Sequence, residues 1–174
     1  PERTLIASLD GLVNDRKLLV LICAWLKEFS SFVHVERLKS LAKTISSEEL
    51  KVLGGLALFC SEFDRRWASV LKMCEKSTSK SQNKLNEFQR LQIKKNGADP
   101  NFKKDGIQIP KINTEGSEKK LLRREFIISN HFWLRLRVLF GVNWRADVSW
   151  EFVRDHEQTA YQVAKRLGCN TETA

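Results

Sequence analysis

Three carboxylates follow one another at four-residue intervals and could act together as ligands or in catalysis: Asp147, Glu151 and Asp155. Residues four apart lie on one face of a helix, so the three side chains would form an acidic stripe. Such a stripe could hold a metal ion through its carboxylate oxygens. We favour a solvated helix face, partly balanced by Arg145 and Arg154, over a carboxylate metal site.

The histidines and cysteines form no recognisable catalytic or metal-binding pattern. His34, His131 and His156 stand alone in the sequence, and a partly buried or helix-capping role is favoured for each over that of a catalytic base. The four cysteines are far apart and lie mostly among apolar residues, so we expect buried reduced thiols rather than disulfides or zinc ligands. They are Cys23, Cys60, Cys74 and Cys169. Phosphate loops, nucleophile elbows and metalloprotease helices are absent from the sequence, so we expect no enzyme activity, cofactor or metal.

The net charge of +9 comes mainly from the middle of the chain. Lys and Arg outnumber Asp and Glu by 12 to 10 in residues 1–76 and by 12 to 5 in residues 77–124, and the two balance at 6 and 6 in residues 125–174. A basic middle segment suits a polyanion partner such as nucleic acid, and it equally suits a solvated linker. The longest apolar run, residues 18–26, is about half of the ~20 residues that span a bilayer. A cytoplasmic protein without membrane contact is therefore expected.

Residues 1–76 have the pattern of a compact helical bundle. Four stretches of helical periodicity predict its helices: residues 14–30, 34–43, 46–60 and 61–76. The first of these is apolar on nearly all sides, which predicts a helix at the centre of the core. Ser46 and Glu49 have the spacing of a capping box at the start of the third. Gly54 and Gly55 lie inside that third helix, where each costs ~1 kcal/mol relative to alanine, so we expect a neighbouring helix to approach closely there.

From residue 77 the sequence becomes polar and basic. Residues 77–117 are predicted to form a basic flexible linker, with poor order at 96–117, because they offer little to bury and contain many turn-forming residues. Leu85, Phe88 and Leu91 could form the apolar stripe of one short helix within it.

The helical pattern resumes after the linker. Residues 118–140 are predicted to form either one bent helix or two helices joined near Asn130. Residues 144–156 form a further helix, for which three residues are predicted to point inward: Val148, Phe152 and Val153. Together with the bundle, this predicts an all-α protein whose third part, residues 118–174, ends in a helix-turn-helix.

The last sixteen residues have the features of that helix-turn-helix. Thr159 is a suitable N-cap for a helix that runs to Leu167. Gly168 can adopt the left-handed conformation that ends a helix and turns the chain sharply. Asn170 or Thr171 can cap a second helix. The chain starts at Pro1 and stops inside this second helix, so we expect a fragment of a longer protein.

The segment VAKRLGCNTETA, preceded by RADVSWEFVRDH, resembles the three-helix core of bacterial winged helix-turn-helix transcription regulators. The resemblance covers residues 144–174 and implies binding of double-stranded DNA, with the second motif helix in the major groove. It places Asn170, Thr171, Glu172 and Thr173 against the groove, and Lys165 and Arg166 against the DNA backbone. The acidic stripe is assigned to the face away from the duplex. Regulators of this class usually read two half-sites, so a homodimer is compatible with the resemblance.

A second hypothesis assigns the chain to a different class. The same short pattern occurs in helix-turn-helix units that bind protein, and the chain would then be a helical interaction module, for example a partner or an antitoxin-like protein. A DNA-binding regulator is the leading hypothesis.

Overall fold

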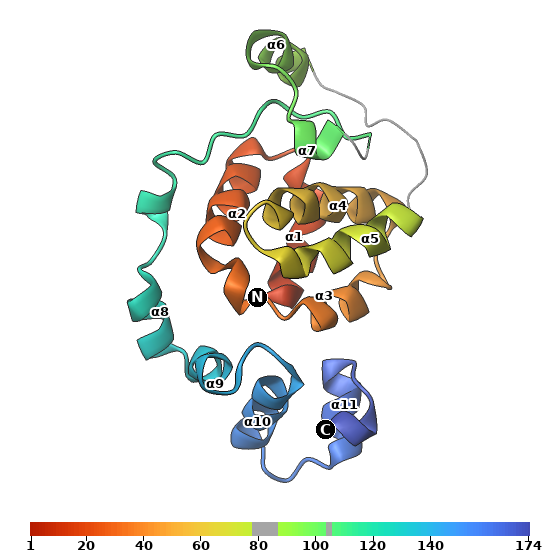
Figure 1. Cartoon of the computed structure of the whole chain (residues 1–174), viewed down its shortest axis with the longest axis vertical. Helices are drawn as coiled ribbons and strands as arrows, with labels where there is room; N and C mark the ends of the chain where they lie inside the picture. The colour runs from red at the N-terminus through yellow and green to blue at the C-terminus, as the bar shows by residue number, and fades with distance from the viewer. Residues whose placement is uncertain (78–86, 104–105) are drawn as a thin grey trace.

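Eleven α-helices and four short 3₁₀ helices make up the computed structural model, which describes residues 1–77, 87–103 and 106–174 (Figure 1). The first five α-helices are α1 (Glu2–Leu12), α2 (Arg16–Phe29), α3 (Val35–Ala42), α4 (Ser47–Ser61) and α5 (Ala68–Ser77). The others are α6 (Glu87–Asn96), α7 (Pro100–Lys103), α8 (Arg124–Asn130), α9 (Phe132–Phe140), α10 (Trp144–Arg154) and α11 (Ala160–Leu167). The 3₁₀ helices are η1 (Ser30–Phe32), η2 (Arg65–Trp67), η3 (Glu118–Lys120) and η4 (Thr171–Thr173). The described residues contain no β-strand, which confirms the all-α prediction.

Side-chain caps fix where several bundle helices begin. The Asp15 carboxylate accepts a hydrogen bond from the Leu18 amide at 3.0 Å and starts α2. Ser46 and Glu49 form the predicted capping box at the start of α4. Such caps satisfy amides that have no partner inside the helix. These local signals are sufficient to place both helix starts from sequence.

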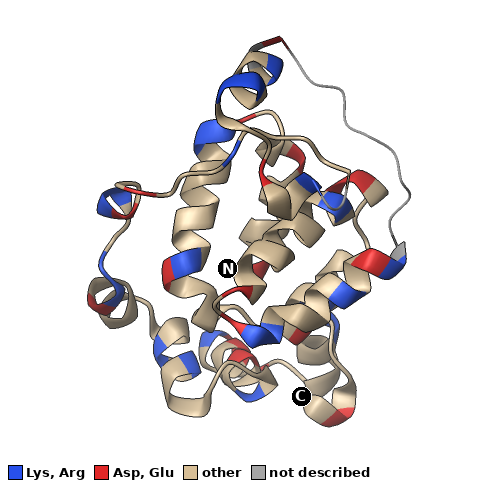
Figure 2. Ribbon diagram, turned by 45° about the horizontal axis from the view of Figure 1, so that its top comes forward, with Lys and Arg blue, Asp and Glu red and all other residues tan. Residues whose placement is uncertain are grey.

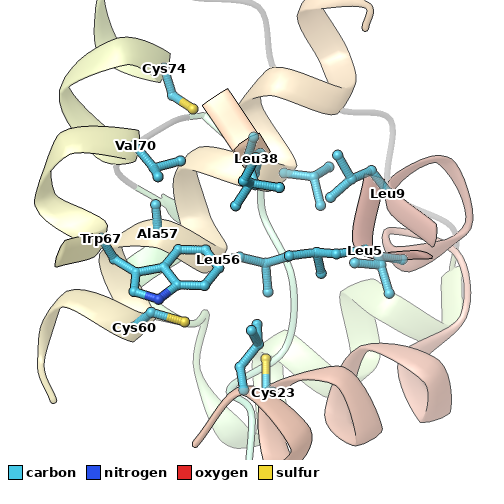
Figure 3. Close-up of a cluster of buried hydrophobic side chains, with 14 of the residues drawn as sticks. Leu5, Leu9, Cys23, Leu38, Leu56, Ala57, Cys60, Trp67, Val70 and Cys74 are labelled. Atoms are coloured by element: carbon cyan, nitrogen blue, oxygen red, sulfur yellow. The ribbon is translucent and has the colours of Figure 1, made fainter. Parts of the chain in front are cut away.

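The core of the bundle surrounds α4 (Figure 3). This helix is buried along most of its length and contacts α1, α2, α5 and α7. Trp67, which precedes α5, is fully buried and packs into the same cluster. Cys23, Cys60 and Cys74 are buried free thiols, as predicted, and burial raises the pKa of Cys23 to about 12.

The prediction that α2 lies at the centre of the core is wrong. One side of α2 is buried, but Lys17, Leu21, Lys27 and Glu28 are exposed on the other. Helix α4, which is buried on all sides between residues 51 and 57, is the central helix instead. The outer side of α2 borders an open groove of about 890 Å³ instead, which also contacts Lys120.

The predicted poor order of residues 96–117 is also wrong for much of that segment. Phe102 in α7 is buried, as are Ile107 and Ile109, and all three belong to the bundle core. Asp99 binds this segment together, because its carboxylate accepts hydrogen bonds from the amides of Asn101 and Ile112. Three apolar side chains in a polar sequence are thus enough to attach it to the bundle. The predicted helix stripe at 85–91 falls partly outside the described residues.

Phe102 also explains a glycine of α4. A Cβ atom at Gly55 would lie 2.3 Å from the Phe102 ring. The expected close approach therefore occurs, but the approaching group is a ring from α7 rather than a long bundle helix. Glycine at this position leaves the space that the ring occupies.

The C-terminal helices pack against the end of the bundle formed by α1 and α3. From the bundle surface, residues 113–123 run past α2 to α8, and α9, α10 and α11 follow below (Figure 1). The helical pattern of residues 118–140 breaks at His131, whose backbone is extended at φ −121° and ψ 100°. Of the two predicted possibilities, the two-helix one is correct.

Candidate nucleic-acid interface

Helices α10 and α11 form the part of the chain that resembles a helix-turn-helix. The Asn143 side chain caps α10 by accepting from the amides of Arg145 and Ala146. Thr159 and Gln162 form a capping box at the start of α11, which confirms the predicted N-cap. One face of α11 is buried through Val163, Ala164 and Leu167. Short polar caps therefore define both helices, and apolar residues dock the second.

The turn after α11 has the predicted left-handed geometry. Gly168 adopts φ 79° and ψ 33°, and its amide donates to the Ala164 carbonyl at 2.8 Å. The Cys169 amide donates to the same carbonyl at 3.1 Å. A left-handed residue at this position redirects the chain within one residue. Asn170 is then extended and precedes the 3₁₀ turn η4.

The predicted groove-facing residues lie together on the surface. Asn170, Thr171, Glu172 and Thr173 are all exposed, and none is covered by the bundle. The first three border a hollow of about 510 Å³ whose other side is formed by residues of α11, the exposed Tyr161 and Lys165 among them. Lys165 and the start of η4 are thus adjacent.

Arg166 points in a different direction from Lys165. Its guanidinium donates to the Glu151 carboxylate at 2.9 Å, which joins α11 to α10. Its backbone carbonyl accepts a hydrogen bond from Arg3 of α1 at 2.6 Å. Arg166 therefore holds the motif together, and a contact with a DNA phosphate would compete with this ion pair.

A buried group of charged residues joins the motif to the bundle. We call it the buried ion cluster, and its members are Glu2, His34, Arg37, Arg137 and Asp147. Arg137 of α9 lies at its centre, with 2.6 Å to a Glu2 oxygen and 2.7 Å to an Asp147 oxygen. Asp147 also accepts from the Trp133 indole at 2.8 Å and lies 2.7 Å from His34 Nδ1. The cluster thus connects α1 and α3 with α9 and α10.

The acidic residues of α10 do not form a solvated face, so that prediction is wrong for Asp147 and Glu151. Asp147 is fully buried in the ion cluster, and Glu151 is 5% exposed beside Arg166. As a consequence Val153, predicted to point inward, is 60% exposed. The carboxylate side of α10 is the buried side because cations from other segments of the chain pair with its carboxylates. No group of three potential metal ligands occurs among the described residues.

Electrostatics keep the buried carboxylates ionised. Burial favours the neutral form of Asp147, but the hydrogen bond with His34 and the charge of Arg137 outweigh it, so the pKa falls from 3.8 to about 2. The pKa of Glu2 is likewise lowered, because the hydrogen bond and charge of Arg137 outweigh burial. Paired charges of this kind are stable only while every partner is in place.

The bundle also contacts the turn of the motif directly. Ser40 of α3 donates through its hydroxyl to the Gly168 carbonyl at 3.0 Å. Together with the bond from Arg3 to Arg166, this contact fixes the start of η4 relative to α1 and α3. His131 and His156 are exposed and lie outside the buried ion cluster.

Replacing Gly168 with alanine is expected to lower the free energy of unfolding by about 1–2 kcal/mol. The side chain would adopt an unfavourable left-handed conformation, and its Cβ would lie 3.2 Å from the Ser40 hydroxyl. Gly97→Ala is the matched control, because Gly97 has a similar φ of 78° and nothing within 4 Å of its Cβ. Urea denaturation of both variants separates the two effects. An equal loss in both would show that the Ser40 contact does not contribute.

Comparison with protein-family models, curated proteins and solved structures finds no match to this chain. None of the helices among the described residues is both long enough and apolar enough to cross a lipid bilayer.

Proposed function

We propose that this protein binds double-stranded DNA through the unit formed by α11, Gly168 and η4, in the manner of a helix-turn-helix transcription regulator. The observation that carries the proposal is the exposed start of η4 directly after a left-handed turn. In helix-turn-helix proteins the N-terminal residues of the second motif helix contact the base edges. Asn170, Thr171, Glu172 and Thr173 hold that position here.

Each of these side chains has a chemistry that suits a duplex. Asn170 can donate to and accept from one adenine, and Glu172 can accept from a cytosine amine. The hydroxyls of Thr171 and Thr173 can bind phosphates or bases. Lys165 supplies a cation beside them, whereas Arg166 is held by Glu151. The proposal therefore assigns phosphate contact to Lys165 first.

The charge of the rest of the chain supports a polyanion partner in a general way. Figure 2 shows Lys and Arg spread over most helices instead of gathered around η4. The resulting long-range attraction to DNA does not depend on base sequence. Specificity would then come from the few residues at the start of η4.

The proposal is tested by selecting duplexes that bind the protein from a random pool. Their affinity is then measured by fluorescence anisotropy at several salt concentrations. Binding should weaken steeply with salt, because each phosphate contact releases counterions. Lys165→Ala should weaken binding to all duplexes alike and reduce the salt slope by about one. Asn170→Ala should weaken only the selected duplexes, by about 1–3 kcal/mol.

Lys27→Ala is the control, because Lys27 is an exposed lysine of α2, outside the motif. The proposal is overturned if the parent chain shows no salt-dependent binding. An equal loss for Lys27→Ala and Lys165→Ala would also contradict it, since the binding surface would then lie elsewhere.

A further inference from the structure

The C-terminal helices carry most of the exposed large apolar side chains of the described residues. In the described part of the chain, eight of the eleven exposed large apolar side chains lie between Leu122 and Tyr161. Seven of these eight side chains lie on α8, α9 or α10 or just before α8: Leu122, Phe126, Phe132, Val138, Leu139, Phe140 and Val153. Concentrations of exposed apolar side chains on a soluble protein are typical of interaction sites.

Part of this surface is continuous across α9 and α10. Phe132 and Leu139 are seven residues apart and therefore lie on the same side of α9. The Phe132 ring lies 6.3 Å from the ring of Trp150 on α10, measured between centroids. Val153, one turn after Trp150, is 60% exposed, and Leu139 is 73% exposed. We call these four residues the α9–α10 apolar surface.

The exposed charges in the segment that carries this surface are mostly positive. The exposed ionic residues between 121 and 154 are five arginines and a single carboxylate: Arg123, Arg124, Arg135, Arg145, Arg154 and Glu125. Asp147 is buried in the ion cluster and does not offset these arginines. Glu151 is buried as well and pairs with Arg166, but it also lies 3.8 Å from Arg154 and offsets part of that charge. Arg135 lies beside the apolar residues themselves, 5.8 Å from the Phe132 ring centroid.

We propose that the α9–α10 apolar surface with its surrounding arginines binds an acidic amphipathic helix of a partner protein. An apolar stripe at i, i+3, i+4 and i+7 would contact the four apolar residues. Glu or Asp beside that stripe would face the arginines, which can bind carboxylates through two parallel hydrogen bonds.

A partner of this chemistry fits better than a second copy of the chain. Pairing two copies through the same surface would bring arginines from both against each other, and like charges at an interface oppose association. Nucleic acid fits less well, because Leu139 and Val153 can neither stack on bases nor bind phosphates. The inference is independent of DNA binding, since it uses residues outside α11 and η4.

The test uses a fluorescent twenty-residue helical peptide with a Leu and Phe stripe flanked by Glu. In one comparison peptide the same stripe is flanked by Lys. The other has the composition of the acidic peptide in scrambled order. The acidic peptide should bind at least about tenfold more tightly than either, a difference of about 1.4 kcal/mol. Equal binding of all three, or no binding, overturns the proposal.

Substitutions at exposed positions locate the binding surface without disturbing the core. Leu139→Ser and the double change Arg135→Glu with Arg154→Glu should each reduce peptide affinity at least about tenfold. Leu91→Ser on α6 is the matched control, because Leu91 is likewise an exposed helical leucine, at 60% against 73% for Leu139, and it should leave affinity unchanged. Circular dichroism of each variant verifies the fold.

Sedimentation and direct titration distinguish the other occupants. If the chain dimerises and Leu139→Ser abolishes the dimer, the surface belongs to a second copy and the proposal is wrong. It is also wrong if single-stranded oligonucleotides or anionic vesicles bind through Leu139 more tightly than the acidic peptide. A monomer that selects the acidic peptide supports it.

Discussion

Replacing Asp147 with alanine is expected to lower the free energy of unfolding by about 3–5 kcal/mol, the cost of leaving buried charges without their partner. Asp147 and Glu2 balance Arg37 and Arg137 inside the buried ion cluster. Without the Asp147 carboxylate, this site has two arginines and one carboxylate away from water. The Trp133 indole also loses its acceptor.

The loss should begin in the C-terminal helices, because Asp147 holds α10 to the bundle. Hydrogen exchange should therefore increase first in α9, α10 and α11, while the amides of α4 remain protected. Chemical denaturation followed by tryptophan fluorescence measures the total effect. Trp133 donates to Asp147 and Trp144 packs against His34 with ring centroids 4.5 Å apart, so both report on the cluster.

Glu36→Ala is the control for this prediction. Glu36 lies in α3, close in sequence to His34 and Arg37, but its side chain is 58% exposed and pairs with Lys39 at the surface. Exposed pairs contribute about 0–1 kcal/mol. A loss for Asp147→Ala no larger than that for Glu36→Ala would show that the cluster does not hold the two parts of the protein together.

The second large effect is expected for Gly55→Ala, which should destabilise the bundle by about 2–4 kcal/mol. The new Cβ would lie 2.3 Å from the Phe102 ring, so the ring must leave its site. Loss of a buried phenylalanine costs about 3–5 kcal/mol, and the gain in helix propensity returns only about 1 kcal/mol. The measurement is urea denaturation monitored by circular dichroism.

Two further variants make this test specific. Gly11→Ala adds a methyl group in α1 with an ordinary contact of 3.8 Å to Leu18, so it should be neutral or stabilising. In a Phe102→Ala background, Gly55→Ala should no longer destabilise, because the clash is absent. Equal losses for Gly55→Ala with and without Phe102 would contradict the assigned role of the ring.

Features that depend on neighbouring residues could be predicted from the sequence. The capping boxes of Ser46 with Glu49 and Thr159 with Gln162 are formed within one helical turn, and the pattern alone identifies them. Gly168 likewise takes the left-handed conformation that its place after Leu167 indicates.

Features that depend on distant residues could not be predicted in this way. Asp147 and Glu151 look like a solvated stripe in isolation, since nothing nearby in the sequence reveals that Arg37 and Arg137 pair with Asp147 and that Arg166 pairs with Glu151. Phe102 is one apolar residue in a polar segment, and the segment itself does not reveal that its ring packs against Gly55 of α4. Helix α1 has no side-chain N-cap, so the sequence shows no local signal for its start.

DNA contact through Asn170 and its neighbours stays a prediction. The structure brings Lys165, Asn170, Thr171 and Glu172 to one exposed hollow, and it assigns Arg166 to a structural ion pair. The sequence could not separate the roles of the two cations, because the partner of Arg166 is Glu151 on another helix.

The pairing of Glu2 with Arg137 has a consequence for how the protein matures on the ribosome. The two residues are 135 positions apart, so at about 5–20 residues per second synthesis of the second follows the first by about 7–27 s. Throughout that interval the Glu2 carboxylate lacks the guanidinium partner that it has in the folded protein. Glu2 therefore reaches its final environment only after the segment up to Arg137 has been synthesised.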